Sequence, residues 1–244
     1  MNRQGFSRST GWLKLIAMSS PRIDIISIGT LARNRLWNES EDVRSAHATT
    51  TLVRSTKLTI LIDPGLPAPA LAARLFERTG LTPGDVDVIF LTNFRPARRG
   101  GLALFPEAKI LIHSVEQEAA IARLTQWIDE SPQGDEDHAL FRKELRLLKS
   151  LDVADDKLAD GVDLFPLFGQ TPGTCGLLVS APTTSTLITG DAVPTREHFL
   201  AGQVLPDAFN IKAAQESMAE AYEIADLIVP GYDNIFQNPR SVGV

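Results

Sequence analysis

Short stretches in which apolar and polar residues alternate are interspersed along this chain with stretches of helical periodicity. Residues 22–28, 49–53 and 57–62 are rich in β-branched side chains, which predicts three strands, the last two of them paired as a hairpin. Residues 68–78 place leucines at helical spacing, and Gly80 follows where a glycine commonly ends a helix. The first third of the chain therefore mixes strands with a helix.

The middle of the chain continues this mixture. A nearly unbroken apolar run at 86–91 predicts a buried central strand. Ser114 and Gln117 have the spacing of a capping box, which predicts a helix with Ser114 as its N-cap. Residues 131–137 are expected to form a polar linker before an amphipathic helix at 139–148.

The last third returns to strands. They are expected at 162–168, 177–180, 187–189 and 227–229. Asn210 precedes a helical pattern over 211–224 and is its predicted N-cap. Because strands dominate each half and helices interrupt each half, we expect an α/β fold, a four-layer αββα sandwich, with a doubly wound parallel sheet as the alternative.

The domain organisation is expected to be simple. Residues 1–20 are predicted to form a disordered tail, with Met18 as an alternative start, and residues 21–244 a single domain. Apolar runs fall short of the roughly 18 residues that span a bilayer, so we expect no membrane insertion.

Composition narrows the possible functions. Twenty-four Lys and Arg against thirty Asp and Glu leave a net charge of −6, which argues against nucleic acid as a partner. The single cysteine, Cys175, excludes an internal disulfide framework and a multi-cysteine metal site. A lone thiol fits a reducing compartment, and we expect a cytoplasmic protein.

Function in layered α/β folds sits on the loops that follow strands. The loops that have this position and a polar or glycine-rich composition are 63–65, 92–101, 171–176, 189–191 and 230–233.

These loops resemble those of the metallo-β-lactamase fold family, over about residues 22–240 and in the family's order. In that family an apolar strand ending in Leu-Thr runs into His-x-His-x-Asp-His-x-Gly-Gly, and later loops read Thr-Pro-Gly-His, Thr-Gly-Asp and Val-Pro-Gly-His-Asp. The matching frame residues here are Leu91-Thr92, Gly100-Gly101, Thr171-Pro172-Gly173, Gly190-Asp191, and Val229-Pro230-Gly231 with Asp233. The resemblance implies the αββα fold and, for ordinary members, zinc-dependent hydrolysis.

The family's metal ligands are almost all replaced. The corresponding positions hold Asn93, Arg95, Ala97, Arg98, Thr174, Asp191 and Tyr232. Of these only Asp191 keeps a ligating side chain, whereas catalytic zinc needs at least three His, Cys or carboxylate ligands. We therefore predict a degenerate member with no zinc cofactor and no metal site.

A different metal site is an alternative. Asp63, Asp191 and Asp233 would suit Mg²⁺ or Mn²⁺ if they converged, although Asp63 and Asp233 also have the positions of turn and capping residues. The four histidines are not closely spaced, so we expect them to be isolated.

Three arginines on one loop point to a different use of the pocket. Arg95, Arg98 and Arg99 are candidates for binding a small anion, because guanidinium groups grip carboxylates and phosphates in a bidentate way. The alternative is internal ion pairing to Asp63, Asp191 and Asp233.

Three functions follow from this set of residues. The first is a non-catalytic protein whose vestigial pocket is paired internally or holds a small anion. The second is a hydrolase of a small ester, thioester or lactone, and the third is a scaffold or interaction subunit. The vestigial pocket is expected to comprise Asp63, Asn93, Arg95, Ala97, Arg98, Thr174, Asp191, Tyr232 and Asp233.

Overall fold

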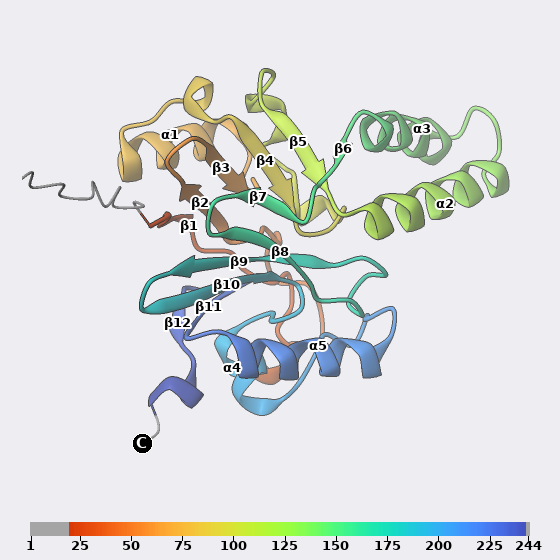
Figure 1. The fold of residues 1–244 in the computed structure, drawn as a ribbon. Coiled ribbons are helices and arrows are strands. Elements are labelled where there is room, and N and C mark those ends of the chain that lie inside the picture. Colours follow the sequence, from red (N-terminus) through yellow and green to blue (C-terminus); the bar gives the residue numbers. More distant parts are fainter. Residues whose placement is uncertain (1–19, 243–244) are drawn as a thin grey trace, which may run out of the picture.

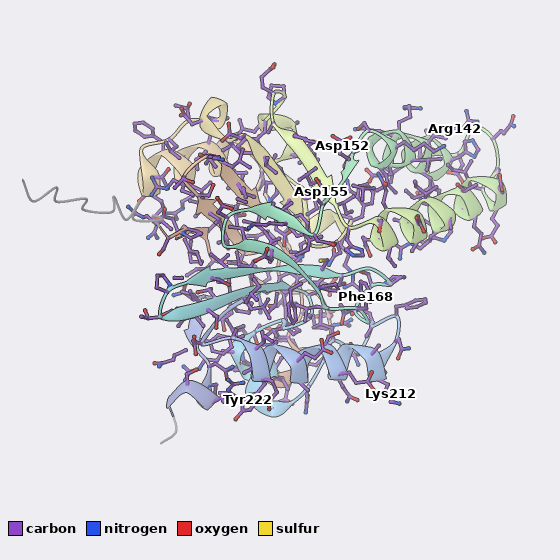
Figure 2. All side chains as sticks on the ribbon, viewed as in Figure 1. Arg142, Asp152, Asp155, Phe168, Lys212 and Tyr222 are labelled. Carbon is purple, nitrogen blue, oxygen red and sulfur yellow. The ribbon has the colours of Figure 1, made fainter. Side chains whose placement is uncertain are left out.

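Two six-stranded sheets packed face to face, with helices on their outer faces, make up the fold (Figure 1). The structure is a computed structural model that describes residues 20–242, so the tail expected over residues 1–20 lies almost entirely outside the described residues. The architecture is the predicted four-layer αββα sandwich, not the doubly wound alternative. Side chains fill the space between the sheets (Figure 2).

The first sheet is built from the N-terminal part of the chain, with its strands in sequence order. Its strands are β1 (Arg22–Ser27), β2 (Thr50–Arg54), β3 (Thr59–Ile62), β4 (Val88–Leu91), β5 (Lys109–Ile112) and β6 (Asp152–Val153). β1, β2 and β3 form an antiparallel meander, which includes the predicted hairpin, and β3 to β6 run parallel. All four residues of β4 are buried, as the unbroken apolar run predicted.

The second sheet is built from the C-terminal part and has the order β12-β11-β10-β9-β8-β7. Its strands are β7 (Lys157–Ala159), β8 (Val162–Pro166), β9 (Cys175–Ala181), β10 (Thr184–Gly190), β11 (Leu227–Pro230) and β12 (Phe236–Gln237). Only the β10–β11 pair is parallel. The short strands β6, β7 and β12 were not predicted, because two or three residues carry too little periodicity.

The helices form the two outer layers (Figure 1). They are α1 (Ala68–Thr79), α2 (Ser114–Glu130) and α3 (Glu136–Lys149) beside the first sheet, and α4 (Arg196–Ala201) and α5 (Ile211–Ile224) beside the second. The part of the chain that the structure describes also contains five 3-10 turns: η1 (Arg35–Trp37), η2 (Pro83–Asp85), η3 (Pro96–Arg98), η4 (Leu102–Leu104) and η5 (Pro239–Val242). No helix within residues 20–242 is both long and apolar enough to cross a membrane.

Helix termini show where local sequence rules hold and where they fail. Gly80 ends α1 in the left-handed conformation at φ 73°, and the Asn210 side chain caps α5, both as predicted. The capping box at Ser114 is wrong, because the His113 side chain is the N-cap of α2. Gln117 instead reaches α3 and donates to the Leu148 carbonyl oxygen at 3.1 Å. The polar linker expected over residues 131–137 is shorter than predicted, since α3 begins at Glu136.

The ends of β4, β10 and β11 bring the candidate loops together between the two sheets. The amide of Cys175, at the start of β9, donates to the Thr92 carbonyl oxygen at 2.9 Å, which joins the loop after β4 to the second sheet. Gly190 has φ +56°, and a Cβ at this position would lie 2.4 Å from Thr92 Oγ1. This glycine is therefore required for the close approach of the two loops.

Candidate functional site

The Arg98 side chain is fully buried and lies between two buried carboxylates. Its Nη1 is 3.0 Å from Asp63 Oδ2, and its Nη2 is ion-paired with Asp191 Oδ1. Nη1 also donates to the Gly231 carbonyl oxygen at 3.3 Å. One guanidinium thus joins the loop after β3, the loop after β10 and the loop after β11.

Asp63 follows β3 and is held in place by Thr92. Its backbone is left-handed, with φ +51°, a conformation that aspartate tolerates better than most residues. Its Oδ1 accepts the Thr92 backbone N–H at 2.9 Å, and its Oδ2 accepts the Thr92 hydroxyl at 2.7 Å. Thr92 therefore aims this carboxylate at Arg98.

Asp191 follows β10 and has more cationic and polar partners than Asp63. Asn93 Nδ2 donates to its Oδ2 at 2.7 Å, and Arg95 Nε lies 3.8 Å from the same oxygen. Arg95 extends outward to Asp207, with Nη1 3.0 Å from Asp207 Oδ2. The network thus continues from the buried centre to the surface.

Tyr232 closes the cluster on the side of β11. The Arg98 Cζ atom lies 4.6 Å from the centre of the phenol ring, within the range of a cation–π contact. The ring is buried with Leu31 and Leu205, and Ala97 packs against this group. Ala97 therefore contributes packing to the pocket and no polar atom from its side chain.

Burial and ion pairing shift the pKa values of the two carboxyl groups in opposite directions. Burial raises the pKa of Asp63 to about 6, and Arg98 and the Thr92 donors offset only part of that rise. Burial also disfavours ionised Asp191, but Arg98 and Arg95 outweigh it and hold the pKa of that carboxyl below its usual range. The carboxylates around Arg98 keep the pKa of its guanidinium above the ordinary value despite burial. A charged Arg98 with ionised Asp191 is the stable core of the cluster.

Two of the predicted pocket residues, and one arginine of the predicted anion-binding trio, make their contacts elsewhere. Thr174 Oγ1 accepts the Thr171 backbone N–H at 3.0 Å and takes part in a separate network. Asp233 accepts the backbone N–H of Arg196 at 3.2 Å, which is the capping role weighed as its alternative. The Arg99 side chain stacks on Phe94 and is ion-paired with Glu144, away from Arg98.

A buried glutamate that sequence reasoning missed supports the loop after β4. Glu116 is 1% exposed, and its Oε1 accepts the Phe94 N–H at 3.0 Å. Its Oε2 accepts the Thr171 hydroxyl at 2.6 Å and the Gly173 N–H at 3.1 Å. Nothing in the local pattern of α2 distinguishes this glutamate from the exposed ones.

A cavity of about 370 Å³ opens beside Tyr232. Its lining includes Arg33, Arg35 and Arg95 as well as the carboxylates of Asp42 and Asp207. Only one arginine of the predicted anion-binding trio, Arg95, lies on this cavity.

A sequence profile described as the metallo-beta-lactamase superfamily matches residues 46–229, well over half of the chain. The chain belongs to this superfamily.

Solved structures agree on the fold. A Thermotoga maritima protein assigned to the metallo-beta-lactamases superposes with a TM-score of 0.65 at 16% identity, over 89% of this chain and 99% of that one. A Staphylococcus aureus protein described as a metal-dependent hydrolase superposes with a TM-score of 0.66 at 14% identity, over 89% of this chain and 90% of that one. AidC, a dizinc quorum-quenching lactonase, superposes with a TM-score of 0.60 at 18% identity, over 84% of this chain and 80% of that one. None of the curated protein sequences matches this chain.

The superfamily commonly uses zinc, so the donor set of this member is decisive for its chemistry. Within residues 20–242 no group of three or more His, Cys, Asp or Glu side chains is placed to hold a metal ion. Asp63 and Asp191 are the two predicted carboxylates that the structure brings together, and Arg98 lies between them.

The raised pKa of Asp63 predicts an unusual dependence of stability on pH. The folded state holds the Asp63 proton more tightly than the unfolded state, whose pKa is 3.8. Protonation of Asp63 therefore stabilises the folded state. This stabilisation is fully present below about pH 4 and is lost as pH rises through about 6. Asp63→Asn removes this titration and keeps the shape and the left-handed backbone.

The measurement is urea unfolding of both proteins at pH 4.5 and 7.5. We expect the free energy of unfolding of the wild type, minus that of Asp63→Asn, to fall by about 2 kcal/mol between these pH values. A difference that grows with pH would mean that ionised Asp63 is favoured by the fold and would contradict the assignment.

Proposed function

We propose that this chain is a non-hydrolytic member of the superfamily in which the Arg98 guanidinium takes the structural place of a metal ion. The observation that carries the proposal is the fully buried Arg98 side chain paired with both Asp63 and Asp191. A buried dication and a buried guanidinium both supply positive charge to these carboxylates, but only the dication can activate a bound water molecule.

The residues present do not fit zinc. Zinc takes thiolate, imidazole and carboxylate ligands, whereas the family's ligand positions here offer mainly amide, methyl, hydroxyl, phenol and guanidinium groups. A dication beside Asp191 would also have to displace Arg98 or tolerate repulsion from it. The Mg²⁺ or Mn²⁺ alternative lacks its third carboxylate, because the Asp233 side chain is engaged with the Arg196 backbone.

A metal-free hydrolase would need an activated nucleophile. Cys175 is the single thiol of the chain, and burial raises its pKa to about 12, so it stays protonated at neutral pH. The pKa of the Tyr232 phenol is likewise raised by burial and by the nearby Asp191 carboxylate. Neither group is activated for attack on an ester or lactone.

Binding of a small anion is the activity that we propose for the pocket. The 370 Å³ cavity beside Tyr232 carries three guanidinium groups, from Arg33, Arg35 and Arg95. Arg95 is partly engaged by Asp207, whose side chain is 64% exposed. A solvent-exposed ion pair contributes little, so a carboxylate or phosphate ligand can replace Asp207 at small cost.

The absence of hydrolysis is tested with a panel of a simple ester, a thioester and an N-acyl-homoserine lactone, the class of molecule whose ring-opened product is bound in AidC. The purified protein is assayed alone and after incubation with Zn²⁺, Mn²⁺ or Mg²⁺. We expect rates equal to those of the metal salts alone and less than about a tenth of an equivalent of bound metal. Turnover that disappears in a folded Asp191→Asn variant would contradict the proposal.

Anion binding is tested by thermal unfolding in acetate, citrate or phosphate at constant ionic strength. A ligand at about ten times its dissociation constant adds about 1.4 kcal/mol of stability and raises the unfolding midpoint of a domain of this size by about 3–6 °C. We expect Arg35→Gln to reduce that rise and Arg142→Gln to preserve it, because Arg142 lies on α3 (Figure 2) and does not line the cavity. Equal responses of both variants would refute the site.

A further inference from the structure

A second, mostly apolar groove lies between α2, α3 and the loop that follows β4. Its volume is about 530 Å³, within the roughly 300–1,000 Å³ typical of small-molecule pockets. The walls are formed by Phe94, Leu124, Trp127, Leu140 and Phe141. These side chains come from three separate elements, so the groove is a product of the fold and not of one helix face.

Much of this apolar wall is open to solvent. Trp127 is 40% exposed and Leu140 is 50% exposed, and the Trp127 ring packs beside the Phe141 ring with centroids 5.2 Å apart. Contiguous apolar surface of this kind favours a ligand that covers it with hydrocarbon.

Guanidinium groups border the groove. Arg99 lies 4.2 Å from the centre of the Phe94 ring, and Arg123 lies 5.3 Å from the centre of the Trp127 ring. Among the residues that the structure describes, Glu144 is the only carboxylate that lines the groove, and it is ion-paired with Arg99. The positive charge of Arg123 therefore faces the groove without a carboxylate of the groove to balance it.

We propose that this groove binds a single-chain amphiphile with a carboxylate head, of the class of medium-chain fatty acids. The hydrocarbon chain lies along Trp127, Leu140 and Phe141, and the carboxylate lies at Arg123. The excess of guanidinium groups selects an anionic head, and the carbon-lined walls select an apolar tail.

This groove adjoins the Arg98 cluster, because Arg95 lies 3.8 Å from Asp191 and also lines the groove, but the two sites are distinct. Arg95 lines both cavities, but the groove contains neither Asp63, Asp191 nor Tyr232. Its ligand needs no metal and no reaction, so the proposal stands whether or not the chain hydrolyses a substrate.

Isothermal titration calorimetry of the full chain with hexanoate, octanoate and decanoate, all below micelle-forming concentrations, tests the proposal. Burial of each additional methylene tightens binding by about fourfold, so affinity rises steeply along the series. Decanol, which lacks the charge, is expected to bind two- to fivefold more weakly than decanoate, and Arg123→Gln removes this difference.

Two matched substitutions locate the site. Leu140→Glu places a carboxylate in the groove, whereas Leu200→Glu places one on α4, where the leucine is 58% exposed. Both positions are solvent-accessible, so both variants are expected to fold. We expect Leu140→Glu to weaken decanoate binding at least tenfold and Leu200→Glu to leave it unchanged.

Three results would overturn the proposal. They are affinity that does not depend on chain length, equal binding of decanoate and decanol, or equal effects of the two leucine substitutions. Loss of decanoate binding in Arg35→Gln, with Leu140→Glu unaffected, would assign the ligand to the cavity beside Tyr232.

Discussion

The ion pairs of Arg98 with Asp63 and Asp191 are the interaction on which the centre of this molecule depends. Each carboxylate follows a strand of a different sheet, Asp63 after β3 and Asp191 after β10. Burial of two carboxylates without a partner is costly, and a single guanidinium with two donor edges satisfies both. The site therefore links the two halves of the sandwich.

The surrounding residues adapt the pocket to this central cation. Asn93 donates a hydrogen bond to the Asp191 carboxylate. The Tyr232 ring stacks on the Arg98 guanidinium in a cation–π contact. Arg95 adds a second positive charge on the side of Asp191. Asp191 faces two guanidinium groups and Asp63 faces one. This difference explains why burial raises the pKa of Asp63 while Asp191 stays ionised.

Much of this arrangement was predictable from the sequence, because the loops that carry it follow strands with clear patterns. The frame glycines and Leu91-Thr92 indicated the fold, and internal pairing of Arg98 with Asp63 and Asp191 was one of the two expectations for the arginines. The separation of Arg99 from this group was not predictable, because three arginines on one loop can point to different sides of a short 3-10 turn.

Other features depend on tertiary contacts that no local pattern records. Glu116 is buried because backbone N–H groups of two distant loops converge on it, although its place in the first turn of a helix is typical of an exposed residue. His113 caps α2 in place of the expected Ser114.

The central claim is tested most directly by the free energy of unfolding of Arg98→Met and of the triple variant Arg98→Met/Asp63→Asn/Asp191→Asn. Arg98→Met leaves two buried carboxylates without their cation, and we expect it to lose about 3–5 kcal/mol at neutral pH. Neutralising both carboxylates is expected to recover most of that loss. A triple variant as unstable as Arg98→Met alone would show that Arg98 acts through its volume, and would contradict the proposal that its charge takes the place of a metal ion.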